Sequence, residues 1–224
     1  MPARAVTVYT DDMAPLAVEA ARRVRRFLHC DPILIRANSP GDAYLTKLRL
    51  HHILGPVPLM FFDADWWPVR EGNLPFAPDG FAAVHDAPGM ADERAFPHWD
   101  VRQLNLPPRD YCNTGFFLAD FRSARVCEAF DRAAGYWATR GQFAIRDFGE
   151  QTFLNLALFV SRIRPTLLPD IWNRVHPGAY TAGQARRLPP SATRDLIAIH
   201  AAGVEQGQKE LWLKIHAGAC NPGG

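Results

Sequence analysis

Hydrophobic residues along the chain follow two different periods. Short runs rich in β-branched and apolar side chains predict strands, because such side chains suit a buried pleated surface. Apolar residues that recur every three or four positions predict amphipathic helices. We expect strands over residues 6–10, 32–36, 58–62, 80–84 and 115–118, with a further apolar run over 196–200. Helices are expected over residues 16–28, 43–54, 123–139 and 151–159.

Strands and helices follow one another in an order that indicates an α/β fold. Residues 58–62 are apolar throughout, as in a strand that is buried on both faces of a parallel sheet. Residues 86–108 and 177–192 contain prolines but show no clear period, and the first of these stretches is typical of a long loop or a lid over a site. A length of 224 residues with 48% hydrophobic content fits a single domain over residues 1–224.

Charge is nearly balanced, with 25 Lys and Arg against 23 Asp and Glu and a net charge of +2. Such a chain has no overall field that would hold nucleic acid or an anionic membrane, so an anionic ligand needs local cations. The basic cluster at residues 22–26 falls within a predicted amphipathic helix and is typical of a solvated helix face, which we favour over a partner site. We expect no nucleic-acid partner.

The cysteines and the N-terminus bear on the compartment. Cys30, Cys112, Cys127 and Cys220 lie far apart and form no C-x-x-C pair, which argues against a structural zinc site and fits a reducing compartment. The N-terminus leads into a polar strand instead of an apolar signal core, and no run approaches the ~18 apolar residues of a membrane span. We expect a cytoplasmic protein without a transmembrane segment.

Two carboxylates stand directly after the strand predicted at residues 58–62. Asp63 and Asp65 flank Ala64 just beyond the carboxyl end of that strand, where ligands bind in open α/β sheets. Two neighbouring carboxylates repel each other unless a cation lies between them, and hard oxygen ligands select Mg²⁺ or Mn²⁺. Such a cation would bridge to a diphosphate. D-x-D alone is a short pattern, and a solvated turn that ends a strand is the alternative interpretation.

A histidine offers a third ligand. The apolar run 196–199 ends at His200, which could reach the same sheet edge and complete the metal shell. The residues alone favour the alternative of a hydrogen-bonded core histidine.

Further polar segments punctuate the predicted strands and helices in the same order along the chain. They read Val8-Tyr9-Thr10-Asp11-Asp12, Tyr44-Leu45-Thr46-Lys47-Leu48-Arg49, Gly80 to Asp86, Tyr111-Cys112-Asn113-Thr114-Gly115, Asp147 to Asn155, and Lys209-Glu210-Leu211-Trp212. With Asp63, Asp65 and His200 they resemble the retaining GT-A glycosyltransferases of family 8, the group that includes glycogenin and the bacterial lipopolysaccharide galactosyltransferases. The resemblance rests on about seven short segments whose order and chemistry agree.

This resemblance implies a GT-A (Rossmann-like) nucleotide-diphospho-sugar transferase fold, with a mostly parallel central sheet flanked by helices. It also implies transfer of a hexose with retention from a nucleotide sugar, a UDP-sugar in particular, with Mn²⁺ or Mg²⁺ as cofactor. The acceptor, whether glycan, lipid-linked or protein, is left open, and bacterial glycoconjugate synthesis is the expected setting.

The resemblance also implies a role for each matching residue. Thr10 and Asp11 would hold the uracil and ribose, and Lys47 would reach the diphosphate, as a point charge can. The D-x-D of Asp63, Ala64 and Asp65 would bind the metal together with His200. The donor sugar would be read by Asp86 and by Asn113 with its neighbour Thr114. The reacting centre would receive Asp147, Glu150 and Gln151, with Glu150 in place of the usual aspartate.

Two features depart from the family. The family follows its metal histidine closely with G and then K-P-W, whereas here Gly203 is separated from Lys209 by a longer stretch, so the assignment of Lys209 to the diphosphate is weaker than that of Lys47. Trp66 and Trp67 stand where the family has small or β-branched residues; plain packing is favoured over stacking on an acceptor or a lid.

The implied chemistry divides between the leaving group and the reacting carbon. The metal and Lys47 would neutralise the charge that develops on the leaving diphosphate. Gln151 and Glu150 would stabilise the oxocarbenium-like carbon, and Glu150 would be the nucleophile if a covalent intermediate forms.

Two alternatives stay open. A sugar-1-phosphate nucleotidyltransferase also uses acidic metal ligands, but residues 10–15 are not the Gly-rich phosphate loop that this class requires. A non-catalytic nucleotide-sugar-binding protein would keep the same pocket without transfer.

Overall fold

A six-stranded sheet forms the centre of the computed structural model, which describes residues 3–74, 80–86, 111–140, 149–175, 195–202, 204 and 206–220. The strand order is β2-β1-β3-β6-β5-β7, and every strand runs parallel to the others except β6. The strands are β1 (Arg4–Tyr9), β2 (Pro32–Arg36), β3 (Pro58–Phe62), β5 (Phe81–His85), β6 (Cys112–Asp120) and β7 (Thr166–Leu168). The predicted α/β fold with a mostly parallel sheet is confirmed.

A second, three-stranded sheet lies beside the first. It consists of β4 (Trp66–Pro68), β9 (Ala198–His200) and β8 (Arg174–Val175), in the order β4-β9-β8. The apolar run at 196–200 therefore supplies a strand of this small sheet, and no strand of the central one. Because β4 follows the Asp63-Ala64-Asp65 segment directly, the small sheet still brings β9 to the edge of the central sheet.

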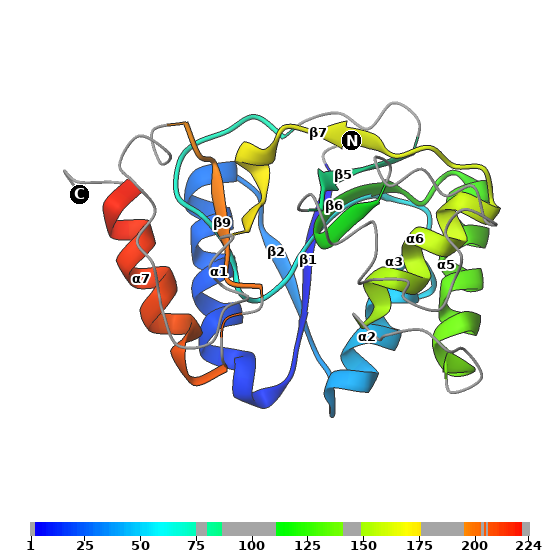
Figure 1. The fold of residues 1–224 in the computed structure, drawn as a ribbon, viewed down its shortest axis with the longest axis horizontal. Helices are drawn as coiled ribbons and strands as arrows, with labels where there is room; N and C mark the ends of the chain where they lie inside the picture. The colour runs from blue at the N-terminus through cyan, green and yellow to red at the C-terminus, as the bar shows by residue number, and fades with distance from the viewer. Residues whose placement is uncertain are drawn as a thin grey trace.

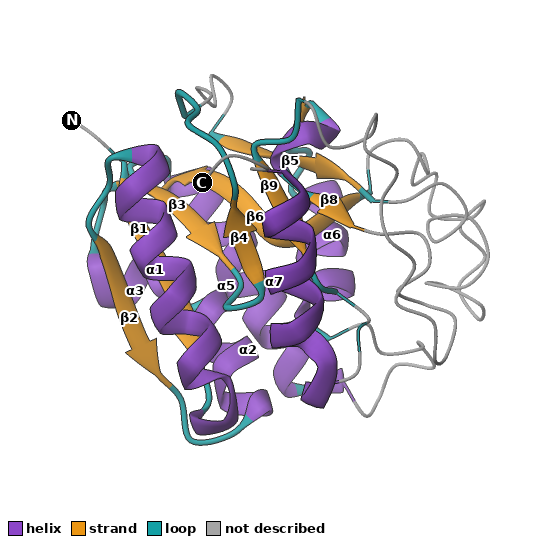
Figure 2. Ribbon diagram, turned by 90° about the vertical axis from the view of Figure 1, so that its left-hand side faces the viewer, coloured by secondary structure: helices purple, strands orange, loops and turns teal. Residues whose placement is uncertain are grey.

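Helices cover both faces of the central sheet (Figures 1 and 2). One face carries α1 (Ala14–Leu28) and α7 (Lys209–Cys220) together with the small sheet, and the other carries α2 (Pro40–Leu48), α3 (Leu50–Leu54), α5 (Ala124–Ala138) and α6 (Glu150–Val160). The single helix expected over 43–54 is two helices, because the backbone of Arg49 leaves the helical region between α2 and α3. Single 3-10 turns are η1 (Asp11–Met13), η5 (Asp170–Trp172) and η7 (Gln206–Gln208).

The pleat of the strands divides the apolar residues between two cores. In β3, Phe61 packs on the α5–α6 side and Phe62 on the α1 side; in β6, Phe117 and Phe116 divide in the same way. Phe61 and Phe117 are register partners whose stacked rings have centroids 5.0 Å apart. Because both faces are covered, β3 is apolar throughout instead of alternating with polar residues, as is the stretch 116–119 of β6.

The aromatic pair after the D-x-D is part of the core. Trp66 and Trp67 are 0% and 1% exposed, and Phe116 lies between the rings of Trp66 and Trp172, with centroid distances of 4.6 and 5.7 Å. The indole N–H of Trp66 donates to the backbone oxygen of Trp172 at 2.8 Å. The packing interpretation of the two tryptophans is confirmed.

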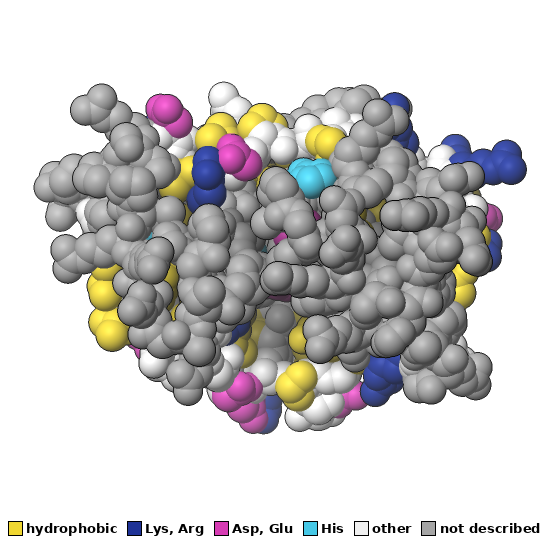
Figure 3. Space-filling view, viewed as in Figure 1, with side chains coloured by type: hydrophobic (Ala, Val, Ile, Leu, Met, Phe, Trp, Pro, Cys, Tyr) yellow, Lys and Arg dark blue, Asp and Glu magenta, His cyan; other side chains and the backbone are white. Residues whose placement is uncertain are grey.

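Within the described part of the chain, no helix is both long and apolar enough to cross a lipid bilayer. On the face shown in Figure 3, the described acidic and basic side chains stand in small mixed groups around the rim. The predicted loop or lid at 86–108, beyond Asp86, and the irregular stretch at 177–192 lie outside the described residues.

Candidate active site

The D-x-D segment makes a tight turn between the two sheets. The backbone N–H of Asp63 donates to the oxygen of Gly115 at 2.8 Å, and the N–H of Trp66 donates back to the oxygen of Asp63 at 3.0 Å. The side chain of Asp65 is buried, whereas that of Asp63 is 35% exposed. Ala64 is buried and its methyl group joins the core on the α1 side. The turn therefore holds its two carboxylates fixed at the carboxyl end of β3.

His200 reaches the same carboxylates through the small sheet. The register of β4 and β9 pairs His200 with Trp66, one residue beyond Asp65. The Nε2 atom of His200 lies 3.3 Å from Oδ1 of Asp65 and 3.8 Å from Oδ2 of Asp63, and one ligand atom from each residue lies within 4.8 Å of the others. The structure thus brings together the three predicted ligands. Two carboxylate oxygens and one imidazole nitrogen fit Mn²⁺ or Mg²⁺.

Gly115 provides the space for the His200 ring. A Cβ atom at this position would lie 2.1 Å from Cε1 of His200 and 2.8 Å from both ring nitrogens. No side chain fits there without displacing the imidazole. A glycine is therefore needed at position 115 because the His200 ring lies against its backbone.

Two lysines face the two aspartates. Lys47, at the end of α2, is 3% exposed; its Nζ lies 3.2 Å from Oδ1 of Asp63 and 2.5 Å from Oε1 of Glu150, and 4.3 Å from the ring centroid of Phe61. Lys209, at the start of α7, forms an ion pair with Asp65. Both lysines that the resemblance assigned to the diphosphate thus lie at the site.

Neighbouring charges outweigh burial at Lys47 and Asp65 but not at Asp63. Burial alone would lower the pKa of Lys47, but the carboxylates of Asp63 and Glu150 raise it above its ordinary value. Burial alone would raise the pKa of Asp65, but His200 and Lys209 hold it well below its ordinary range. At Asp63 burial outweighs the nearby Lys47 ammonium and raises the pKa. The carboxylate of Asp65 is therefore ionised, which is the form that could bind a metal ion.

Gln151 and Glu150, in the first turn of α6, are fixed by hydrogen bonds. Gln151 accepts from the backbone N–H of Thr114 at 3.0 Å and donates from Nε2 to Oδ2 of Asp86 at 2.8 Å. The hydroxyl of Thr114 donates to Oε1 of Glu150 at 3.0 Å. The predicted sugar-reading residues Asp86 and Thr114 thus contact the predicted catalytic pair. Asp147 lies outside the described residues.

The first residues of β6, within the polar segment 111–115, belong to a bulged part of the strand. Along the pairing of β5 with β6, Ala83 faces Phe117 but the next residue, Val84, faces Asn113. Residues 114–116 therefore have no partner on β5, which frees the N–H of Thr114 for Gln151 and that of Gly115 for Oδ1 of Asn113, at 2.9 Å. A bulge next to a site redirects side chains in this way.

Two residues support the site without having been assigned a role. Asn173, 3% exposed, donates to Oδ1 of Asn113 at 2.8 Å, while its own Oδ1 is buried without a hydrogen-bond partner. Tyr111 accepts at its hydroxyl from Gln151 at 3.3 Å, and burial raises the pKa of Tyr111 to about 12. Tyr111 stands within a matching segment and could have been found there; no sequence motif signals Asn173.

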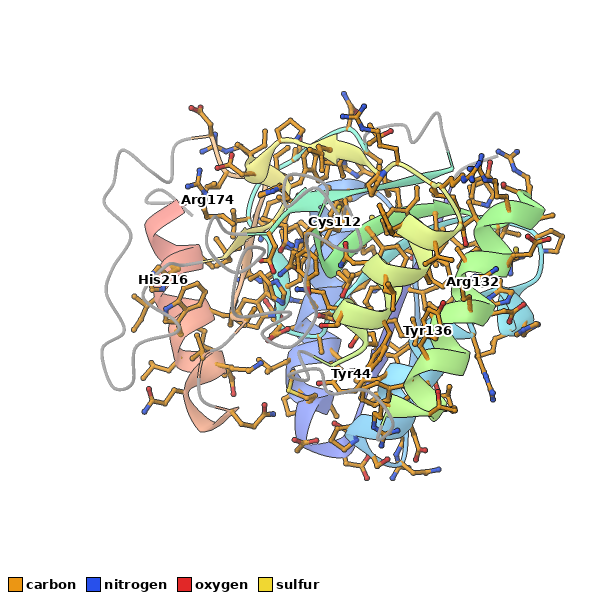
Figure 4. All side chains as sticks on the ribbon, turned by 45° about the vertical axis from the view of Figure 1, so that its right-hand side comes forward. Tyr44, Cys112, Arg132, Tyr136, Arg174 and His216 are labelled. Atoms are coloured by element: carbon orange, nitrogen blue, oxygen red, sulfur yellow. The ribbon has the colours of Figure 1, made fainter. Side chains whose placement is uncertain are left out.

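Figure 4 shows Cys112 near the centre of the molecule and Tyr44 beside the lower end of α6. The backbone N–H and C=O of Cys112 bind the side-chain amide of Asn155, at 2.8 and 2.9 Å, which fixes α6 against β6.

The expected nucleoside contacts lie at the end of β1. Thr10 is buried and donates to Oδ1 of Asp12 at 2.5 Å, whereas Asp11 is exposed and pairs with Arg36 at 2.5 Å. Because β1 and β3 are parallel neighbours, Thr10 and Asp11 share the sheet edge of Asp63. Among the described residues, neither side chain forms a hydrogen bond or ion pair with Asp63, Asp65 or His200, and Gly203 lies outside the described residues.

No protein-family model and no curated protein matches the sequence. Several solved structures resemble the fold: the bifunctional glycosyltransferase WbbM (15% identity, 89% of this chain and 45% of that chain, TM-score 0.65), the galactosyltransferase LgtC in complex with donor and acceptor sugar analogues (13% identity, 95% of each chain, TM-score 0.61), and GlyE of Streptococcus pneumoniae TIGR4 (12% identity, 96% of this chain and 60% of that chain, TM-score 0.64). The chain thus spans about half the length of WbbM and nearly all of LgtC. At these identities the likeness shows the fold, and the fold of this chain is that of the GT-A glycosyltransferases.

Proposed function

We propose that this chain is a metal-dependent glycosyltransferase that moves a sugar from a nucleotide-sugar donor, a UDP-sugar, to a glycan, lipid-linked or protein acceptor with retention at the anomeric carbon. The observation that carries the proposal is the continuous cluster of side chains at one sheet edge. Asp63 and Asp65 from one turn and His200 from the end of β9 converge, and Lys47 connects them to Glu150. Donor type and retention follow from the resemblance to family 8.

The cation-binding end of the cluster suits a diphosphate leaving group. A divalent ion held by Asp63, Asp65 and His200 would neutralise negative charge on the diphosphate. Lys47 and Lys209 each lie against one of the two aspartates, so their ammonium groups are placed to meet the same phosphates. Preorganised positive charge of this kind lowers the barrier for departure of an anion.

The other end of the cluster, formed by Glu150 and Gln151, suits the reacting sugar carbon. The amide of Gln151 is held by Thr114 on its oxygen and by Asp86 on its nitrogen, which fixes its orientation. The carboxylate of Glu150 is fixed between Lys47 and Thr114. Oxygen atoms held in this way can stabilise a carbon that becomes positive without first having to reorient. Asp86 and Asn113 lie close enough to this pair to bind sugar hydroxyls.

A ligand screen by thermal shift tests the proposal without an acceptor. UDP-, GDP- and CMP-sugars are tested with and without Mn²⁺, because a ligand that binds only the folded state raises the melting temperature. One UDP-sugar is expected to raise it only when Mn²⁺ is present. Asp65→Asn should remove this shift and abolish sugar transfer while the fold persists, since one carboxylate ligand is lost.

The matched control is Glu128→Gln, which removes an exposed carboxylate on α5 and should leave donor binding and transfer intact. Normal transfer by Asp65→Asn with added Mn²⁺ would refute the metal assignment. A Mn²⁺-dependent shift without donor hydrolysis or transfer to any acceptor would instead favour a non-catalytic donor-binding protein.

A further inference from the structure

A second cluster of metal-ligating side chains lies on the α5–α6 side of the sheet. His51 and His52 are neighbours in α3, and both direct Nε2 toward one carboxylate oxygen of α5, Oδ1 of Asp131, at 3.0 and 2.7 Å. The two imidazole rings are 3.9 Å apart between centroids. Figure 4 labels the next residue along α5, Arg132, on the outer side of the helix.

These three residues are independent of the candidate active site. The active-site group combines two carboxylates and one imidazole, whereas this group combines two imidazoles and one carboxylate. The additional imidazole shifts the preference from Mg²⁺ and Mn²⁺ toward Zn²⁺, Co²⁺ and Ni²⁺. The two groups therefore differ in the metals that they select.

A hydrogen-bonded triad is the simplest alternative, since one carboxylate oxygen can accept two N–H groups. The side chain of His51 is 5% exposed, and its Nδ1 is buried with no hydrogen-bond partner among the described residues. A hydrogen-bonded triad would leave this nitrogen unsatisfied, and its second imidazole, that of His52, is 59% exposed. A cation between the three atoms would bind the neutral form of both imidazoles.

We propose that His51, His52 and Asp131 form a zinc-class metal site that ties α3 to α5. In tetrahedral zinc sites neighbouring ligand atoms are about 3.3 Å apart, so the observed contacts have to lengthen only slightly to admit the ion. His52 and Asp131 are exposed, which leaves water access to the fourth position. Within the described residues, no hydrogen-bond acceptor holds Nδ1 of His51 and so orients its ring, and we expect a modest metal affinity compared with a structural zinc site.

A metal ion bound between α3 and α5 would act next to α2, the helix that carries Lys47 into the candidate active site. α3 follows α2 directly after Arg49, and α2 carries Lys47 to Asp63 and Glu150. A metal bound between α3 and α5 would therefore stabilise the segment that places Lys47. It would raise the stability of the folded chain in proportion to the logarithm of metal concentration.

The test uses the full chain without a histidine tag. Co²⁺ is titrated while its visible absorption is recorded, and Zn²⁺ is titrated by calorimetry. The wild type should bind two equivalents of Co²⁺, and Asp63→Asn/Asp65→Asn should retain one. His52→Gln, at an exposed position of α3, should lose that remaining equivalent or weaken it at least tenfold, while Glu128→Gln, on the same helix as Asp131, should have no effect.

Zinc should also raise the melting temperature of the double variant, and His52→Gln should abolish that rise. Absence of Co²⁺ and Zn²⁺ binding from the double variant would overturn the proposal, as would binding that both His52→Gln and Asp131→Asn leave unchanged. If the double variant does not fold, the decrease from two equivalents to one in His52→Gln alone decides the question. Neither result depends on donor binding, so this site and the proposed function stand or fall separately.

Discussion

At the scale of single residues, the candidate site depends on a glycine, Gly115, as well as on its polar side chains. A Cβ atom at position 115 would overlap the His200 ring, so only glycine fits there. The sequence could indicate that a glycine belongs in this segment, but it gave no reason, since the imidazole that approaches it comes from 85 residues further along the chain. Asn173 escapes sequence reasoning for the same cause: its partner, Asn113, is distant in the chain.

Gly115→Ala should therefore disable the metal ligand while leaving most of the fold in place. The new methyl group would overlap the His200 ring, so the imidazole has to rotate away from Asp63 and Asp65. We expect the affinity for Mn²⁺ to fall at least tenfold, measured by calorimetry. Gly135→Ala in α5 is the control, because nothing lies within 4 Å of its Cβ and alanine stabilises a helix by about 0.5–1 kcal/mol relative to glycine. Equal Mn²⁺ affinity in both variants would contradict this role of Gly115.

At the scale of elements, most strands and helices could be predicted from periodicity, and the exceptions have identifiable causes. The helix expected over 43–54 breaks at Arg49, although the residues around the break are ordinary helix formers. The bulge in β6 changes which face its side chains occupy, so that Cys112 and Phe117 share one core despite their odd separation. Strict alternation along residues 112–117 would thus assign half of them to the wrong face.

The entry to α6 shows how one backbone conformation positions two functional groups. Gly149 has φ 67° and ψ −151°, a region that only glycine occupies without strain, and its Cβ would lie 3.1 Å from Cζ of Tyr44. Gly149→Ala should destabilise the protein by about 1–3 kcal/mol in denaturant unfolding and weaken donor binding, because Glu150 and Gln151 follow directly.

Gly55→Ala provides the comparison. Gly55 has a similar positive φ of 74° but open space around its Cβ, and it precedes β3 instead of the catalytic pair. Its variant should lose a similar amount of stability without loss of donor affinity. If Gly149→Ala binds the donor as well as Gly55→Ala does, the position of Glu150 and Gln151 does not depend on this turn.

At the scale of the whole molecule, strand and helix order led to the correct fold class, whereas the reversed direction of β6 and the separate small sheet had no signal in the sequence. Both depend on which strands pair over long distances, and pairing leaves little trace in local periodicity. The structure nevertheless brings Asp63, Asp65 and His200 together with Lys47 and Glu150, an arrangement the sequence could indicate because parallel strands bring their carboxyl ends to one edge. The functional roles of these residues stay predictions, and Asp147 and Gly203 lie outside the described residues.

At the same scale, the raised pKa of Tyr111 affects the free energy of unfolding of the whole chain at alkaline pH. Burial raises the pKa of Tyr111 to about 12, above the ordinary tyrosine value of about 10. A raised pKa in the folded state leaves stability unaffected below about pH 10 and lowers it progressively between 10 and 12, as the unfolded chain ionises first. Tyr111→Phe should reduce the pH dependence of the free energy of unfolding in that range. It should also remove one tyrosine that ionises well above pH 10 from an ultraviolet titration; an unchanged titration would show that Tyr111 is accessible.

The ion pairs of Lys47 with Asp63 and of Lys209 with Asp65 mean that the active-site acids already have cations when no ligand is bound. A metal ion has to displace ammonium groups, and each displaced lysine then needs an anion. A diphosphate supplies that anion but gains little while the lysines are occupied by carboxylates. Under the proposed function, metal and donor thus bind with positive thermodynamic coupling, and by reciprocity each raises the affinity of the other by the same factor. The enzyme would hold each ligand more firmly once the other is bound.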